Sequence, residues 1–157
     1  MKNISLLGHP IITMHKICFL NEKIQDHWLK KKLNLSLAQY MILIFLSLKP
    51  GLSQEDIAQR RNCTEASVSR IIRIMAEKKF ITSRSAVGDK RKKELFLSDR
   101  GRKLLVRAKN IVNQEFGLIL QKVGQEEENK LKKSLDKILL TITDRAHKLS
   151  VIRQEKQ

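Results

Sequence analysis

The fold is decided by residues 50–73, which read PGLSQEDIAQRRNCTEASVSRIIR. Ser53 is placed to cap a short helix, because a serine oxygen can accept hydrogen bonds from the first free N–H groups of a helix. Asn62 tolerates the left-handed backbone of a sharp turn, and Thr64 can cap a second helix directly after it. In that second helix, apolar and polar positions fall on opposite sides, with Val68, Ile71, Ile72 and Met75 facing inward and Ser67, Arg70 and Arg73 facing outward. The stretch predicts a helix-turn-helix.

After Phe80 the pattern changes from helical to extended. We expect a short strand over residues 81–84, a turn rich in cations over 87–93 and a returning strand over 94–97. A helix-turn-helix followed by a basic hairpin, or wing, is an architecture suited to DNA. Its second helix fits the major groove and presents polar side chains to base edges, while the wing reaches the adjacent backbone or minor groove.

The flanking segments predict further helices. Apolar residues recur at positions 17, 20, 24 and 28, and Lys30–Lys32 closes this helix with cations, which suits a helix C-terminus. Ser36 and Gln39 form a capping-box pattern before an apolar helix that ends at Leu48. Two long helices with apolar stripes follow, over 101–122 and 127–149. So short a chain cannot cover both stripes, and a second copy of the chain is the simplest partner.

The charge of the chain favours a polyanionic partner. Lys and Arg number 32 against 16 Asp and Glu, which gives a net charge of +16. Between Arg60 and Lys103 there are fourteen basic and five acidic residues, a net +9, so over half of the surplus lies in this segment. The clustering favours DNA binding over a generally basic surface, and the 41% hydrophobic content argues against disorder.

Five motifs occur in order: LSLAQYMIL (35–43), PGLSQEDIA (50–58), TEASVSRII (64–72), GDKR (88–91) and LSDRGR (97–102). As a set they resemble the MarR family, strongly so over residues 35–105. The resemblance implies a single domain over 1–157 that is mostly α (α+β). It would be a winged helix-turn-helix with N- and C-terminal dimerisation helices. The DNA-binding lobe would span 35–100 and the dimerisation helices 10–33 and 101–150, interleaved between two chains.

The resemblance also implies which residues lie near DNA. The candidates on the second helix and the wing are Thr64, Ser67, Ser69, Arg70, Arg73, Arg84, Asp89, Lys90, Arg91 and Lys92. Asp89 and Arg91 match the family's wing motif, in which the arginine enters the minor groove and the acid orients it. The chain departs from the family pattern at Arg61–Asn62, where an apolar residue and a glycine are usual, and at Lys79, where glycine is usual.

Cys18 lies in HKICFL (15–20) on the first predicted helix. This resembles the context of the reactive cysteine in the organic-peroxide-sensing branch of the family. Those sensors place a tyrosine where this chain has Leu37, and only Tyr40 remains. An aliphatic neighbour does not activate a thiol, so we interpret Cys18 as a buried structural cysteine and keep a redox role as the alternative. Core packing is also expected for Cys63.

Other classes of function find little support in the sequence. His15 and Cys18 share a helical face but have no convincing third metal ligand, and no set of residues suits catalysis, so neither a cofactor nor an enzyme is expected. The longest apolar run is too short to span a bilayer, and no signal-type segment is recognised, so a cytoplasmic location without membrane contact is expected.

The sequence therefore predicts a homodimeric regulator, usually a repressor, that binds double-stranded DNA at a pseudo-palindromic operator. A small-molecule or oxidative signal would relieve the repression. The alternatives are a non-specific nucleic-acid or nucleoid-associated binder, favoured by the +16 charge, and a peroxide sensor based on Cys18.

Overall fold

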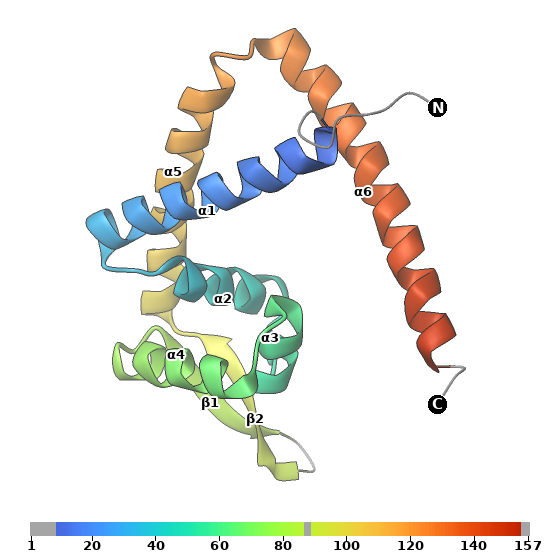
Figure 1. Cartoon of the computed structure of the whole chain (residues 1–157). Coiled ribbons are helices and arrows are strands. Elements are labelled where there is room, and N and C mark those ends of the chain that lie inside the picture. The colour runs from blue at the N-terminus through green and yellow to red at the C-terminus, as the bar shows by residue number, and fades with distance from the viewer. Residues whose placement is uncertain (1–8, 87–88, 155–157) are drawn as a thin grey trace. The chain divides into compact units, whose positions relative to one another are not determined.

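The computed structural model describes the backbone of residues 9–86 and 89–154, and the side chains of residues 9–85 and 93–146. The chain is mostly helical with one two-stranded antiparallel sheet (Figure 1). The elements in order are α1 (Pro10–Leu33), α2 (Leu37–Leu48), α3 (Gln54–Arg61), α4 (Glu65–Glu77), β1 (Ile81–Ala86), β2 (Asp89–Leu97), α5 (Asp99–Leu120) and α6 (Gln125–Gln154). This part of the chain holds no helix with the length and apolarity needed to cross a membrane.

The predicted helix boundaries are confirmed by the caps. Ser36 and Gln39 form the expected capping box of α2, since the Ser36 oxygen accepts from Gln39 N–H and Gln39 Oε1 accepts from Ser36 N–H. Ser53 and Asp56 form a second capping box at α3. Thr64 caps α4 by accepting from Ser67 N–H at 3.4 Å. Each cap satisfies N–H groups that the helix itself cannot pair.

The core of the winged helix lies among α2, α3, α4 and the hairpin. The residues wholly removed from solvent at its centre are Ile42, Leu43, Ile57, Val68 and Met75. A short bridge joins the α2–α3 connection to the hairpin, because Gly51 N–H donates to Leu95 O at 2.9 Å and Leu95 N–H donates to Leu52 O at 3.0 Å. This third strand-like segment fastens the wing to the helices, and the sequence pattern did not predict it.

The hairpin is longer than the sequence pattern predicted. We expected residues 87–93 to be a turn, and this was wrong, because β2 already begins at Asp89. Ile81 pairs with Leu97, and the regular register continues to Ser85 opposite Lys93 before a shift that pairs Ala86 with Asp89. We predicted a turn because positive charge is dense in this segment, but lysine and arginine are also common on exposed strand edges.

The chain divides into two compact units, residues 1–113 and 114–157. Within the first unit, the start of α5 is locked to the end of α4. Ser98 Oγ accepts from Gly101 N–H at 2.9 Å and donates to Lys79 O at 2.7 Å. A Cβ on Gly101 would lie 2.0 Å from Phe80 O, so only glycine fits this approach.

The second unit consists of the end of α5 and the helix α6, joined through Gly124 at a φ of +87°. Glu126, Glu127 and Glu128 lie in the first turn of α6, where they suit the positive end of the helix dipole. Leu131, Leu139 and Ile142 of α6 are exposed in the single chain.

Candidate nucleic-acid interface

The turn between α3 and α4 sets the position of the second helix. Asn62 adopts φ +49° and ψ +50° and its N–H donates to the carbonyls of Ala58 and Gln59, while Cys63 N–H donates to Ala58 O. Thr64 then starts α4 directly. The turn thus brings two helices together with hardly any intervening residues, which is the geometry of a helix-turn-helix.

Asp56 stabilises the first of these helices. Its carboxylate accepts from the backbone N–H of Ser53 at 2.8 Å and from the Ser53 hydroxyl at 2.7 Å. These hydrogen bonds, first the backbone one and then the hydroxyl, lower the pKa of Asp56 from its ordinary value. The charged carboxylate of Asp56 therefore stabilises the start of α3, the first helix of the helix-turn-helix.

The outer face of α4 carries the predicted recognition residues together. Val68, Ile72 and Met75 are buried against the lobe, as predicted, and the opposite face is open to solvent. The exposed candidates on it are Thr64, Ser67, Ser69, Arg70 and Arg73. A helix with a free face of hydroxyls and guanidinium groups offers both hydrogen-bond readers for base edges and cations for phosphates.

The two departures from the family pattern prove compatible with the expected backbone. Asn62 and Lys79 take left-handed φ angles of +49° and +55°, the region in which glycine is the usual residue. Lys79 N–H donates to Ala76 O at 2.8 Å, and Phe80 N–H to Met75 O at 2.9 Å, so this turn is well bonded. The chain therefore keeps the turn geometry at the cost of some backbone strain and adds a cation at Lys79.

On the wing, Arg84 lies in β1 opposite Glu94 of β2, with its guanidinium 5.2 Å from the centre of the Phe96 ring. The contact with the Phe96 ring orients the Arg84 side chain on the hairpin. The backbone of Asp89–Lys92 belongs to β2, whereas the side chains of Asp89, Lys90, Arg91 and Lys92 lie outside the described residues. Their predicted roles remain predictions.

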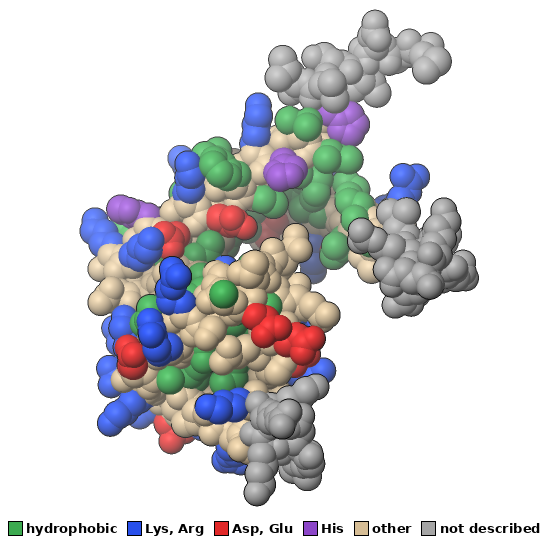
Figure 2. All heavy atoms as spheres, turned by 60° about the horizontal axis from the view of Figure 1, so that its bottom comes forward, with side chains coloured by type: hydrophobic (Ala, Val, Ile, Leu, Met, Phe, Trp, Pro, Cys, Tyr) green, Lys and Arg blue, Asp and Glu red, His purple; other side chains and the backbone are tan. Residues whose placement is uncertain are grey.

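The face that bears the winged helix is rich in cations. Figure 2 turns the lower side of Figure 1 toward the viewer and shows Lys and Arg side chains spread over it, with acidic side chains in smaller clusters. Arg60, Arg70 and Arg73 are all exposed. Such a surface attracts a polyanion at long range and provides contacts to phosphates at short range.

The cysteines differ from expectation. We expected Cys18 to be buried, and this was wrong for the single chain, since the Cys18 side chain is exposed on α1 among exposed apolar neighbours such as Ile17 and Phe19. Cys63 is half-buried at the turn before α4, and neither cysteine is in a disulfide. Burial was inferred from the apolar neighbours in sequence, and those neighbours are themselves uncovered.

Gly101 was identified in the sequence only as part of the LSDRGR motif, and its close packing against the backbone of Phe80 was not predicted. Its close approach to Phe80 O fixes the start of α5 at the end of the recognition helix. The signal was present, since a glycine within the first turn of a helix is unfavourable unless a neighbouring backbone needs the space.

Known proteins share these features. The model of the MarR family matches residues 33–92. The HTH-type transcriptional repressors Mb2911 of Mycobacterium bovis and Rv2887 of Mycobacterium tuberculosis are each 26% identical over 106 residues, which is 68% of this chain and 76% of the relative.

Solved structures have the same fold. MepR, a transcription regulator of the Staphylococcus aureus multidrug efflux pump MepA, is 24% identical with a TM-score of 0.70, covering 85% of this chain and 98% of MepR. Wild-type MarR from E. coli is 17% identical with a TM-score of 0.76, covering 88% of this chain and 99% of MarR. The match to a family of transcription regulators confirms the prediction of a non-enzymatic protein. The motif set, the wing and the shared fold lead to one conclusion: residues 33–92 match the MarR family of winged helix-turn-helix transcriptional regulators, and the chain has the fold of the solved MarR-like regulators.

Proposed function

We propose that the protein is a sequence-specific repressor that binds a pseudo-palindromic operator as a homodimer and releases it in response to a signal. The outer face of α4 carries this proposal. It combines Ser67 and Ser69 with Arg70 and Arg73 on a capped helix whose other side is anchored in the core. Short hydroxyls and forked guanidinium groups on a rigid helix are the equipment for reading base edges.

The relatives support repression and DNA binding as parts of this function. The curated relatives Mb2911 and Rv2887 are named transcriptional repressors. The S. aureus MepR–DNA complex is 25% identical to this chain with a TM-score of 0.66, covering 83% of this chain and 96% of that one. On this basis we place α4 in the major groove and the wing beside it, with Thr64, Arg84 and the residues Asp89–Lys92 near the backbone or the minor groove.

The dimer is supported by apolar surface that the chain leaves uncovered. On α1, the side chains of Ile17, Phe19 and Leu20 are more than half exposed, and on α6 those of Leu139 and Leu140 are about two-thirds exposed. Soluble proteins rarely leave so many large apolar residues open unless a partner covers them. A second copy would cover both helices and place two recognition helices on one operator.

The releasing signal has two candidate entry points in the first unit. A groove of about 530 Å³ lies among α1, α2 and α3, and Phe19, Met41 and Phe45 line it together with Arg60 and Arg61. Lys23 and the carboxylates Glu22 and Asp26 also line it, so apolar walls with charges of both signs suit a small organic molecule with polar groups. The alternative is oxidation of the exposed Cys18, so a thiol-reactivity assay at neutral pH distinguishes an oxidative signal from a ligand.

Titration of DNA tests the function. The chain is titrated against a duplex with its operator, found by genomic footprinting, and against random duplex at several salt concentrations. We expect a slope of log K against log salt of about −6 or steeper, and a preference for the operator of about a thousandfold or more. The half-sites should lie about 10 base pairs apart. A steep slope without a preference would instead favour a non-specific nucleic-acid binder, and a shallow slope would contradict DNA binding through the basic surface.

A further inference from the structure

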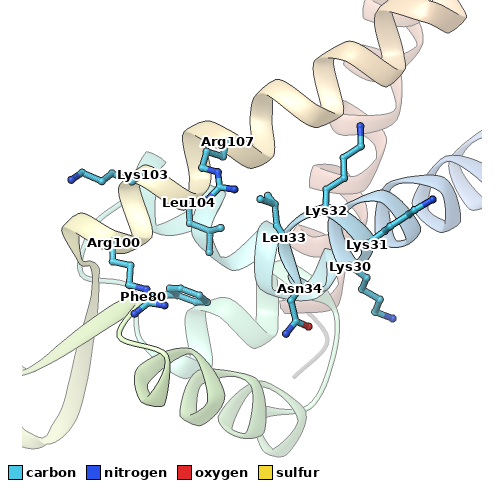
Figure 3. A pocket seen from close by; sticks show the side chains of 10 residues that line it. All are labelled: Lys30, Lys31, Lys32, Leu33, Asn34, Phe80, Arg100, Lys103, Leu104 and Arg107. Atoms are coloured by element: carbon cyan, nitrogen blue, oxygen red, sulfur yellow. The ribbon is translucent and has the colours of Figure 1, made fainter.

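A second basic site lies away from the outer face of α4. A hollow of about 650 Å³ opens where the end of α1, the start of α5 and Phe80 come together within the first unit (Figure 3). Its lining contains six cations and no carboxylate, the cations being Lys30, Lys31, Lys32, Arg100, Lys103 and Arg107. All six side chains are exposed, and some of them also have neighbours on the protein, since Lys31 and Lys32 lie over the Trp28 ring.

The helix dipole favours the three lysines at the end of α1 but disfavours the cations at the start of α5. Lys30–Lys32 occupy the last turn of α1, where positive charge is favoured by the helix dipole, and Lys30 pairs with Asp26 at 2.6 Å. Arg100 and Lys103 instead lie at the beginning of α5, the positive end of that helix, where further positive charge is unfavourable. Arg100, Lys103 and Arg107 are spaced three and four residues apart, which places them on one side of the helix.

The other lining residues define what could occupy the hollow. Leu33, Phe80 and Leu104 form its apolar part. Phe80 and Leu104 are each only 8% exposed, so only the half-buried Leu33 offers appreciable apolar surface to a ligand. The Arg100 guanidinium lies 5.4 Å from the centre of the Phe80 ring and takes up part of that surface. In Figure 3, Arg107 and Leu104 extend from α5 toward Leu33 of α1. Six of the ten lining residues are cations, and arginine forks bind phosphate oxygens in pairs.

We propose that this hollow binds a small multivalent anion of the di- or triphosphate class, and that its occupancy weakens DNA binding. The effect on DNA rests on the proposed function, whereas the binding of the anion does not. Two connections support an effect on DNA. Phe80 follows the recognition helix within three residues, and its carbonyl accepts from Ser98 N–H at 3.1 Å beside Gly101. A bound anion would also neutralise cations that attract DNA at long range.

Calorimetric titration of the full chain with inorganic tripolyphosphate at constant ionic strength tests the site. We expect saturable binding of one anion per chain. The variant R100Q/R107Q should bind at least about tenfold more weakly, because it loses two charge-assisted contacts. The variant K109Q/K132Q removes the same charge from exposed positions outside the hollow and should bind within about twofold of the original chain. If R100Q/R107Q melts at a lower temperature, K31Q/K103Q replaces it and leaves the Arg100–Phe80 contact intact.

Equal weakening in the hollow variant and the control would overturn the site, since the anion would then sense only the diffuse charge. Absence of saturable binding would overturn it as well. DNA titrations with and without tripolyphosphate test the coupling, which predicts a larger loss of DNA affinity for the original chain than for R100Q/R107Q. DNA binding by R100Q/R107Q is also measured without tripolyphosphate at several salt concentrations. If the slope of log K against log salt is shallower than that of the original chain by about 0.9 per removed cation, the hollow contacts DNA and the proposal is refuted. If the chain bound no preferred DNA at all, the proposed function would fail, while calorimetry would still decide whether the anion site exists.

Discussion

The winged-helix lobe and the helix α6 contain similar apolar side chains, but these side chains are buried in the lobe and exposed on α6. In the lobe, Ile57, Val68 and Met75 are fully buried, whereas Leu131 of α6 is 46% exposed and Leu139 is 64% exposed. The lobe thus obtains its hydrophobic stabilisation from its own residues, and α6 does not. The difference indicates that the winged-helix lobe is a self-sufficient fold, whereas the apolar residues of α6 would be covered by the second chain of the proposed dimer.

The largest effect is expected from charges placed on the open face of α6. The variant L135E/L139E should convert the dimer to a monomer, because the dimer interface would then have to bury carboxylates that have no cationic partner. Operator affinity should then fall by a hundredfold to ten-thousandfold, since the second half-site no longer benefits from the first. Light scattering at micromolar concentration and a gel-shift titration measure the two effects.

The matched control for this variant is S134E/T141E, which adds the same charge to exposed polar positions of α6. It should remain dimeric and bind the operator. If L135E/L139E also stayed dimeric, or if the unaltered chain were monomeric at micromolar concentration, the contrast between a self-sufficient lobe and a dependent helix would be wrong.

The next effect tests the lobe itself. Gly101→Ala should lower the free energy of unfolding by about 3 kcal/mol, because its Cβ would meet the Phe80 carbonyl and force backbone to move. Gly117→Ala in the same helix meets nothing within 4 Å and should instead stabilise by about 0.5–1 kcal/mol. Urea unfolding of both variants measures the difference. Equal effects would mean that the close approach at Phe80 O does not constrain the lobe.

The wing is expected to contribute to affinity and little to stability. Arg91→Ala should weaken operator binding by about 1–3 kcal/mol without changing the melting temperature, because the residue lies at the far end of the hairpin. A gel-shift titration beside a thermal melt separates the two. Unchanged affinity would remove Arg91 from DNA binding.

Local signals in the sequence predicted much of the lobe. The caps at Ser36, Ser53 and Thr64 are short-range chemistry, and each lies where its residue type and spacing placed it. The outward face of α4 followed from the same helical spacing. These features could be predicted because each depends on residues within one or two turns of each other.

Long-range contacts could not be predicted in the same way. The bridge from Leu52 to Leu95 and the approach of Gly101 to Phe80 join segments far apart in sequence, and no local pattern encodes them. The exposure of Cys18 depends on what covers α1, which an apolar pattern alone does not reveal. The basic hollow was missed because its cations come from two segments about 70 residues apart, one of which we interpreted only as a helix end.

A smaller effect concerns the pH dependence of the lobe. The pKa of Asp56 is lowered by its hydrogen bonds to Ser53, so its charged form stabilises the fold. This contribution is fully present above the pKa of the unfolded chain and is lost as the pH falls through the lower pKa of the folded state, below about 4. Asp56→Asn should cost about 1 kcal/mol at pH 7 and reduce the loss of stability on acidification. Unfolding curves at pH 7 and in acid compare it with the original chain, and an unchanged acid response would contradict this role.

The smallest effect is expected at Lys79, which adopts φ +55° in the turn between the recognition helix and the wing. A side chain in this region crowds the backbone, and glycine relieves the crowding, so Lys79→Gly should raise the free energy of unfolding by about 0.5–1 kcal/mol. Asn62→Gly, at φ +49° in the other turn, should change it by only a few tenths, because asparagine tolerates this conformation far better than lysine does. If strain at Lys79 is retained for the sake of its charge, Lys79→Gly should also weaken DNA binding and make the salt slope shallower by about 0.9 per chain. A more stable variant with unchanged DNA affinity would show that the cation at this position does not reach the DNA.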